Sequence, residues 1–301
     1  MRLALPGSIL LPLTSLLAMV STLLHVIPLL LAALLKFALP MAAPRRLLNR
    51  VLTAISENWI AVNSAMIRSF TRGQDWRVEG VEHLHRDGWF LVICNHQSWV
   101  DILVLQDVCN RRLPFLKFFL KRELIYVPLL GLAWWALDFP FMRRYSKEQL
   151  ARRPELRGKD VEITRRACAK FAEMPVSIMN FVEGTRLTAA KHAQQQSPYA
   201  QLLKPKAGGV AFVLQTMGSM LQGIIDVTII YPQGRPALSD LLSGRVARVD
   251  VILKARPIPH DLLGGNYEED AAVRDAMQNW INGIWAEKDQ LIAARLAARE
   301  R

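Results

Sequence analysis

The longest apolar stretch of the chain lies at its start. From Leu3 to Leu35 no Asp, Glu, Lys or Arg occurs, and leucine dominates the segment. A helix crosses the hydrocarbon core of a bilayer with about 20 apolar residues, whereas the apolar region of a secretory signal has only about 7–15. The pattern therefore favours a retained membrane anchor over a cleaved signal. We assign residues 1–44 to this anchor, as one span or as a helical hairpin bent at Pro28.

Beyond the anchor, residues 45–301 alternate between helical patterns and runs of strand length. Apolar residues recur at helical spacing over 46–72, after Ser98, over 160–174 and from about Glu268 onward. The expected strands are Asp75–Gly80, Trp89–Cys94, Ser177–Val182, Ile224–Pro232 and Arg245–Ala255. Strands that alternate with helices predict an α/β domain, here one mixed sheet flanked by helices behind the apolar anchor.

A second long apolar segment, Leu124–Met142, has the length of another membrane span. Pro128, Gly131 and Asp138 interrupt it. A single span here would also place the motifs before and after it on opposite sides of the membrane. We therefore expect this segment to lie in or on the membrane surface, or to line an apolar groove.

The charge of the chain indicates an anionic partner. The formal net charge is +12 and the isoelectric point about 10.0. Next to an anchor, lipid head groups are the simplest partner, because Lys and Arg near an anionic leaflet are attracted to it. No nucleic-acid-binding module is recognisable. Arg45, Arg46 and Arg50 follow the anchor whereas only Arg2 precedes it, so the positive-inside rule places the rest of the chain in the cytoplasm.

The stretch "CNHQSWVD", residues 94–101, directly follows the apolar run at Trp89–Ile93. Ser98 and Asp101 match the capping box of a helix start, which would make both residues structural. Alternatively, a turn from strand to helix brings His96 and Asp101 together. Asp101 would then accept the N–H of one imidazole nitrogen, and the other nitrogen of His96 would act as a general base.

The three cysteines are Cys94, Cys109 and Cys168, and none forms a C-x-x-C pair, so neither a zinc site nor a disulfide framework is supported. Cys94 and His96 share one face of a strand, which would suit a cysteine nucleophile. A cysteine at the end of an apolar strand is more often inert packing, and we favour that interpretation.

A second polar stretch, "FVEGTRLT" at Phe181–Thr188, follows another strand. Glu183 and Arg186 could form a surface ion pair of little energetic value. Alternatively, Arg186 grips an anion with two hydrogen bonds, while Glu183 meets a substrate hydroxyl or positions that arginine. Further cations that could converge on a phosphate are Lys117, Lys121, Arg122, Arg143, Arg144, Lys204 and Lys206.

Together these stretches carry a resemblance to a known family. "NHQSWVD" resembles the N-H-x-x-x-x-D block of the glycerolipid acyltransferases, the 1-acyl-glycerol-3-phosphate acyltransferases, and "FVEGTR" resembles their F-x-E-G-T-R block. The similarity runs from about Trp76 to Pro232. The resemblance implies that His96 is the general base and Asp101 its partner. It also implies contacts with glycerol phosphate from Glu183, Gly184, Thr185 and Arg186, and phosphate contacts from Arg144 and Lys121.

Two positions depart from the family pattern. Asp138 stands near a usual glycine, and the late block "GIIDVTIIYP" is more similar to the branch that contains the lysocardiolipin-type enzymes. These departures leave the identity of the acceptor open but do not change the reaction type.

The expected function is that of a membrane-bound O-acyltransferase of the cell inner membrane, with its catalytic domain on the cytoplasmic side. It would move an acyl group from acyl-CoA or acyl carrier protein to the sn-2 hydroxyl of lysophosphatidic acid, or to another lysophospholipid. No cofactor or metal is expected, and the other partners are membrane lipids.

Two other classes of protein are less consistent with the sequence. A serine hydrolase is disfavoured because no G-x-S-x-G elbow occurs. A non-catalytic lipid-binding protein would explain the anchor and the charge, but not why His96 stands five residues before Asp101.

Overall fold

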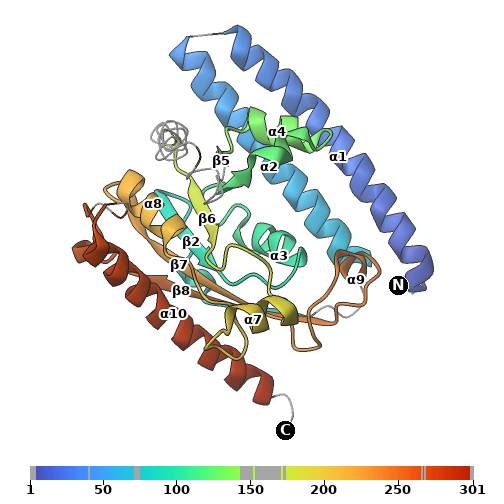
Figure 1. The fold of residues 1–301 in the computed structure, drawn as a ribbon. Helices are drawn as coiled ribbons and strands as arrows, with labels where there is room; N and C mark the ends of the chain where they lie inside the picture. The colour runs from blue at the N-terminus through green and yellow to red at the C-terminus, as the bar shows by residue number, and fades with distance from the viewer. Residues whose placement is uncertain are drawn as a thin grey trace.

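The computed structural model describes residues 5–39, 41–70, 75–142, 152, 171, 174–265, 267 and 269–298. At its centre is a six-stranded sheet with the order β1-β8-β7-β2-β6-β3 (Figure 1). The strands are β1 (Asp75–Glu79), β2 (Trp89–Cys94), β3 (Leu116–Phe118), β6 (Ser177–Phe181), β7 (Leu221–Ile230) and β8 (Arg248–Arg256). Neighbours are parallel except β7 and β8, which are antiparallel. The mixed sheet expected from the sequence is confirmed.

The five predicted strands correspond to β1, β2, β6, β7 and β8. Strand β3 and the separate two-stranded pair of β4 (Leu120–Lys121) and β5 (Phe141–Met142) were not predicted. They are only three and two residues long, too short for a periodicity to show. The predicted amphipathic stretch 160–174 lies almost wholly outside the described residues.

Helices cover both faces of the sheet. Along β2, Leu91 and Ile93 join a core with α8 and α10, while Val92 and Cys94 join a core with α3 on the other face. This alternation follows from the two-residue period of a strand. The larger helices are α1 (Gly7–Ala38), α2 (Ala42–Phe70), α3 (Val100–Cys109), α8 (Gly208–Met217) and α10 (Ala271–Ala297), and the shorter are α4 (Leu130–Ala136), α7 (Ala189–Gln195) and α9 (Leu238–Leu242). Single 3₁₀ turns form η1 (Val81–His83), η2 (Arg122–Tyr126) and η5 (His260–Leu262).

Helices α1 and α2 pack side by side as an antiparallel pair along one side of the molecule (Figure 1). Helix α1 runs through Pro28 without interruption, so the chain does not turn back at that proline. The turn lies instead between Ala38 and Ala42. The expected boundary after residue 44 therefore falls in the first turn of α2, and the helix pair includes residues from both sides of it.

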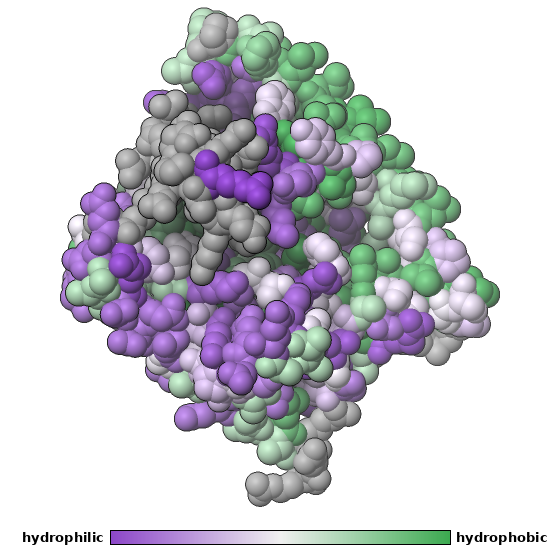
Figure 2. Space-filling view, in the orientation of Figure 1, coloured by the Kyte–Doolittle hydropathy of each residue, from purple (hydrophilic) through white to green (hydrophobic). Residues whose placement is uncertain are grey.

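The outer side of this helix pair is apolar. Helix α1 is the one helix in the described part of the chain that is long and apolar enough to cross a membrane. Many of its large apolar side chains are exposed, as are those of Tyr126, Leu129, Leu132 and Trp135 in and around η2 and α4. Figure 2 shows apolar residues gathered along the side where α1 lies.

The segment Leu124–Met142 forms η2, α4 and β5 rather than a second span. Its buried residues Ala133 and Ala136 pack with Val26 and Leu29 of α1. The expectation that this segment is not a transmembrane helix is confirmed.

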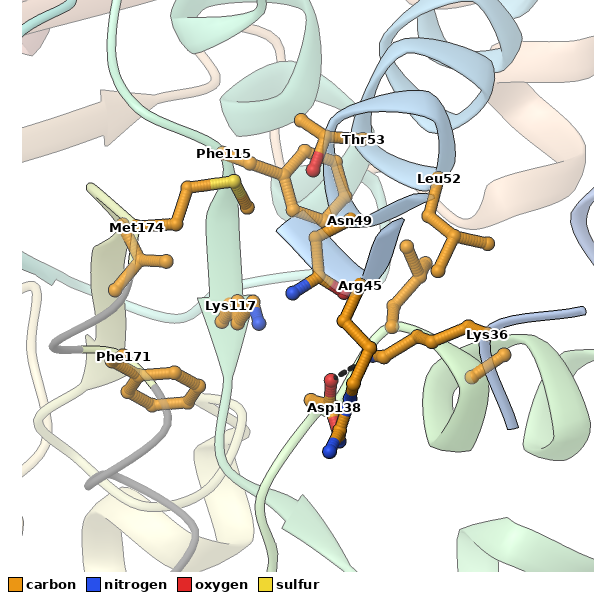
Figure 3. Close-up of a pocket in the computed structure, with 13 residues that line it drawn as sticks. Lys36, Arg45, Asn49, Leu52, Thr53, Phe115, Lys117, Asp138, Phe171 and Met174 are labelled. Atoms are coloured by element: carbon orange, nitrogen blue, oxygen red, sulfur yellow. Dashed lines mark hydrogen bonds and ion pairs between the residues drawn. The ribbon is translucent and has the colours of Figure 1, made fainter. Parts of the chain in front are cut away.

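The conformation of Asp138 explains how an aspartate can stand near a glycine of the family pattern. Its φ is +56°, in the left-handed region that favours glycine, and aspartate tolerates this region better than most residues. Its carboxylate accepts a hydrogen bond from Lys36 Nζ at 2.6 Å (Figure 3). Aspartate therefore keeps the turn and adds an ion pair between the end of α1 and the segment that follows α4.

A buried charge fastens α10 to the sheet. Lys288 is 2% exposed, and its Nζ donates to Asp226 Oδ1 at 2.5 Å, to the carbonyl of Val227 at 2.6 Å and to Thr228 Oγ1 at 3.0 Å. Arg256 Nε donates to the other oxygen of Asp226 at 2.9 Å. All three donor hydrogens of the ammonium are used, which is the condition under which a buried ion is tolerated.

We expect Lys288→Ala to lower the free energy of unfolding by about 3–5 kcal/mol, because it leaves buried acceptors without their cation. The measurement is urea denaturation of the detergent-solubilised chain. Lys254→Ala, on the exposed side of β8, is the matched control and should change the midpoint little. Equal midpoints for the two variants would contradict the assignment.

Candidate active site

The two motifs predicted to share a site meet at the carboxyl ends of two neighbouring strands. Strands β2 and β6 are parallel neighbours in which Cys94 pairs with Phe181, so their carboxyl ends lie side by side. The backbones stay in contact beyond the strands, where Leu187 N–H donates to the carbonyl of His96 at 2.8 Å. Carboxyl ends of parallel strands are where α/β folds place ligand sites.

His96 and Asp101 form the predicted pair. His96 Nδ1 lies 2.8 Å from Asp101 Oδ2, and because a carboxylate only accepts, Nδ1 carries the proton and donates. The imidazole stacks on the ring of Phe181, with 3.8 Å between centroids. These two contacts fix the ring and leave Nε2 as the nitrogen available for a substrate.

The capping interpretation is met only in part, because α3 begins at Val100 with Trp99, and not Ser98, as its N-cap. Asp101 Oδ2 also accepts from the backbone N–H groups of Gln97 at 2.6 Å and Ser98 at 2.8 Å. In return, Ser98 Oγ accepts from Val100 N–H at 3.0 Å. The two hypotheses are therefore not exclusive: Asp101 holds the start of α3 and the imidazole with one oxygen atom.

Tyr231 is a contact that the sequence did not reveal. Its hydroxyl donates to Asp101 Oδ1 at 2.6 Å, so the carboxylate, which is fully buried, is held at both oxygens. Burial raises the pKa of Tyr231 well above its usual value, and the charge of Asp101 adds to this effect, so the hydroxyl keeps its proton as a donor. In the sequence Tyr231 simply ends an apolar strand, and nothing distinguished it from core packing.

Cys94 is packing rather than a nucleophile in this geometry. Its side chain lies on the α3 face of the sheet and is fully buried. Burial raises the pKa of this thiol well above its usual value. Since the thiolate is the reactive form, the preferred interpretation of Cys94 as inert packing is the one that the geometry favours.

The E-G-T-R turn is built on Gly184, whose φ is +68°. Gly184 N–H donates to the carbonyl of Phe181 at 2.8 Å, which closes the turn. A Cβ at this position would lie 3.5 Å from Lys206 Cδ, so the aliphatic part of Lys206 passes beside the glycine. The "KPKAGG" stretch is thereby brought to the same turn.

Glu183 lies inside the protein rather than on its surface. It is fully buried, and its two carboxyl oxygens accept from the backbone N–H groups of His96 at 3.3 Å and Leu203 at 3.4 Å. The surface ion pair with Arg186 that the sequence left open does not form. Burial raises the pKa of Glu183 to about 8, although the two amide hydrogen bonds oppose this shift. At neutral pH this carboxyl is largely protonated.

Arg186 lies over the indole of Trp99, with its guanidinium carbon 4.4 Å from the ring centroid. Thr185 Oγ1 accepts from Lys191 Nζ at 2.6 Å, and the same ammonium donates to the carbonyl of Arg186 at 3.3 Å. Lys191 adds a cation that the sequence analysis missed, because it belongs to α7 beyond the motif. The planar face of Trp99 holds the guanidinium while its N–H edge stays available for an anion.

Two further phosphate ligands were predicted from the sequence, Lys121 and Arg144. Lys121 is exposed in β4, and within the described part of the chain it forms no hydrogen bond or ion pair with the E-G-T-R turn. Arg144 lies outside the described residues. Both remain predictions.

The fold and the histidine–aspartate pair beside a basic turn are those that the sequence analysis predicted for an acyltransferase. The chain belongs to the Acyltransferase family, whose model matches residues 75–232, just over half of the chain. The family predicted from the two motifs is confirmed.

Several relatives illustrate the range of the family. The chain is 27% identical to mouse 1-acyl-sn-glycerol-3-phosphate acyltransferase gamma over 70% of its own length and 53% of the relative's. It is 26% identical to 1-acyl-sn-glycerol-3-phosphate acyltransferase 2 of Arabidopsis thaliana over 77% and 57% of the two chains. Lysocardiolipin acyltransferase 1 of Gallus gallus is 25% identical over 66% and 52%. The chain thus spans about half the length of these relatives.

The fold has a counterpart among solved structures. The 1-acyl-sn-glycerophosphate (LPA) acyltransferase PlsC from Thermotoga maritima superposes with a TM-score of 0.53, covering 93% of this chain and 96% of that one. Sequence identity is 17%, so this similarity concerns the fold.

The buried carboxyl of Glu183 makes the stability of the fold depend on pH. Its pKa is about 8 in the folded chain against a usual 4.5, so between these values the folded state binds a proton that the unfolded state has lost. Stability from this group is therefore full at low pH and is lost as pH rises through about 5 to 8.

We expect the wild type to lose roughly 2–3 kcal/mol more stability than Glu183→Gln between about pH 6 and pH 8.5. Urea midpoints at the two pH values measure this difference. Glu82→Gln, in the exposed η1 turn, should keep the wild-type dependence. A wild-type slope that survives in Glu183→Gln would show that Glu183 does not titrate in this range.

Proposed function

We propose that this protein is a membrane-associated O-acyltransferase that acylates the sn-2 hydroxyl of lysophosphatidic acid to give phosphatidic acid. The observation that carries the proposal is the 2.8 Å contact between His96 Nδ1 and the buried Asp101, made at a histidine whose backbone carbonyl accepts from Leu187 N–H, next to Arg186. The relatives named for 1-acyl-sn-glycerol-3-phosphate acylation support this acceptor. A relative named for lysocardiolipin makes another lysophospholipid the alternative.

The chemistry follows from the pair. His96 Nε2 takes the proton of the acceptor hydroxyl as its oxygen attacks the carbonyl carbon of an acyl thioester. The tetrahedral intermediate collapses, the carbon–sulfur bond breaks, and the imidazolium returns the proton to the leaving thiolate. Asp101 stabilises the imidazolium in between. The donor is acyl-CoA or acyl carrier protein, and no residue of the chain becomes acylated.

The acceptor's phosphate would be held by the cations of the E-G-T-R turn. Arg186, kept in place by Trp99, offers two parallel N–H donors, and Lys206 and Lys191 lie around the same turn. Arg144 and Lys121 are further candidates for this role. Holding both substrates converts a bimolecular encounter into a positioned reaction.

We also propose that α1 lies along the membrane surface instead of crossing the bilayer. Near its start, Thr14 Oγ1 donates to the carbonyl of Leu242 in α9 at 2.7 Å, and near its end Lys36 contacts Asp138. These two contacts are about 33 Å apart along a helix, close to the roughly 30 Å thickness of the hydrocarbon core. Because one domain makes both contacts, the helix lies flat against it. An inner-membrane location with the domain on the cytoplasmic side is consistent with this arrangement.

The direct test is acyl transfer from acyl-CoA to lysophosphatidic acid by the purified full chain. We expect His96→Ala to lower kcat by about 100-fold or more, the scale of losing a general base. His85→Ala, at an exposed histidine, should keep wild-type turnover. An active His96→Ala variant would overturn the catalytic assignment, and turnover with lysocardiolipin alone would support the alternative acceptor.

Tyr231→Phe tests whether the second oxygen of Asp101 matters to catalysis. Loss of one donor to a charged group, worth about 1.5–3 kcal/mol, frees the carboxylate to rotate and misorients the imidazole. We expect kcat to fall about tenfold, with the KM of both substrates nearly unchanged. Tyr199→Phe, which loses a hydroxyl contact to the carbonyl of Asn282 at 3.2 Å, is the matched control. Equal kcat values for the two variants would contradict this role.

A further inference from the structure

A second basic site lies near the amino ends of β3 and β6, whereas His96 follows the carboxyl end of β2. Two adjoining cavities open between α2 and the starts of β3 and β6, and they share Asn49, Thr53, Phe115 and Met174. We call them together the basic hollow; Figure 3 shows the cavity that Lys36, Arg45 and Lys117 line. His96 follows the carboxyl end of β2, whereas Phe115 precedes β3. The catalytic mechanism therefore makes no use of this hollow.

Positive charge dominates the lining of the basic hollow. Its cations are Lys36, Arg45, Arg46, Arg50, Arg86 and Lys117, and its carboxylates are Glu57 and Asp138. Both carboxylates already have cationic partners. Glu57 accepts two hydrogen bonds from Arg86, at 2.9 and 2.8 Å, and Asp138 accepts one from Lys36.

The arginines of α2 lack such partners. Within the described residues, Arg45, Arg46 and Arg50 form no ion pair, and all three are exposed. Arg46 and Arg50 stand one helical turn apart, where like charges repel and destabilise a helix. The first turn of α2 contains no acidic residue, so the helix does not relieve this repulsion itself. An anion bound between the two guanidinium groups would relieve the repulsion.

The surroundings of these arginines point to a lipid as the source of that anion. Around the connection between α1 and α2, next to these arginines in the sequence, Phe37 is 80% exposed, Met41 60% and Leu47 62%. Exposed apolar side chains of this size, close in sequence to unpaired arginines, match the boundary between acyl chains and head groups. A free anion would need the cations but not the apolar surface.

We propose that the basic hollow binds the phosphate of an anionic membrane phospholipid. The phosphodiester would lie between Arg46 and Arg50, and Asn49 and Thr53 would offer polar side chains to the glycerol and phosphate oxygens. The acyl chains would run along the exposed apolar side of α1 and α2. This lipid is neither acceptor nor product but a bound component that seats the helix pair on the surface. The inference rests on the membrane association proposed above, and not on acyl transfer.

The test is native mass spectrometry of the full chain released from neutral detergent micelles, with phosphatidylglycerol or phosphatidylcholine added. We expect wild type to retain phosphatidylglycerol, and Arg46→Gln/Arg50→Gln to retain roughly tenfold less or weaker still. Arg77→Gln/Arg295→Gln removes the same charge at the β1 edge and should bind as wild type does. Without lipid, the first variant should melt no lower than wild type, since a repulsive pair is gone.

Four outcomes would overturn the inference. Equal retention by the two double variants would show attraction by net charge alone, and equal retention of phosphatidylcholine would show apolar adhesion. Displacement of the lipid by inorganic phosphate would mean a free-anion site. Displacement by CoA would assign the hollow to the donor's phosphates. Acyl transfer is measured on the same samples, so its absence would count against the proposed reaction and leave the lipid result standing.

Discussion

One carboxylate, that of Asp101, accepts hydrogen bonds from four donors in two distant parts of the chain. Three belong to residues 96–98 between β2 and α3, and the fourth is the hydroxyl of Tyr231 just beyond β7. A buried charge without donors would be expensive, so the strand ends and the helix start are held together around it. The orientation of the imidazole follows from the same requirement, which couples the stability of this edge to its chemistry.

The environment of this carboxylate differs from that of its acidic neighbour. Asp101 has four donors, whereas Glu183 has two long contacts to backbone amides and a pKa of about 8. Burial with few hydrogen-bond donors raises the pKa of the Glu183 carboxyl. The two acids therefore differ in what they connect: Asp101 joins the start of α3, the imidazole and Tyr231, whereas Glu183 joins the E-G-T-R turn to the backbone of His96.

Much of the fold and the core of the site could be predicted from the sequence, because their signals are local. The apolar runs of β2, β6, β7 and β8 have the length of buried strands, and each motif follows such a run directly. The spacing of His96 and Asp101 suited a strand-to-helix turn, which the structure contains. Strand β3 and the pair β4–β5 could not be predicted, because two or three residues carry no periodicity. Of the two forms of the anchor left open, α1 is continuous through Pro28 and the chain turns between Ala38 and Ala42.

The sequence by itself determined the chemistry of this protein: which residues can take a proton, which can hold a phosphate, and which segment prefers lipid. Those properties belong to single side chains and to short periods. Only the tertiary structure decided which groups share a site. Tyr231 reaches Asp101 from 130 positions away, Lys206 comes to lie beside Gly184, and three arginines of α2 come to face the starts of β3 and β6. Contacts of this kind depend on the order of strands in the sheet, and strand order results from packing both faces at once, which no local pattern encodes.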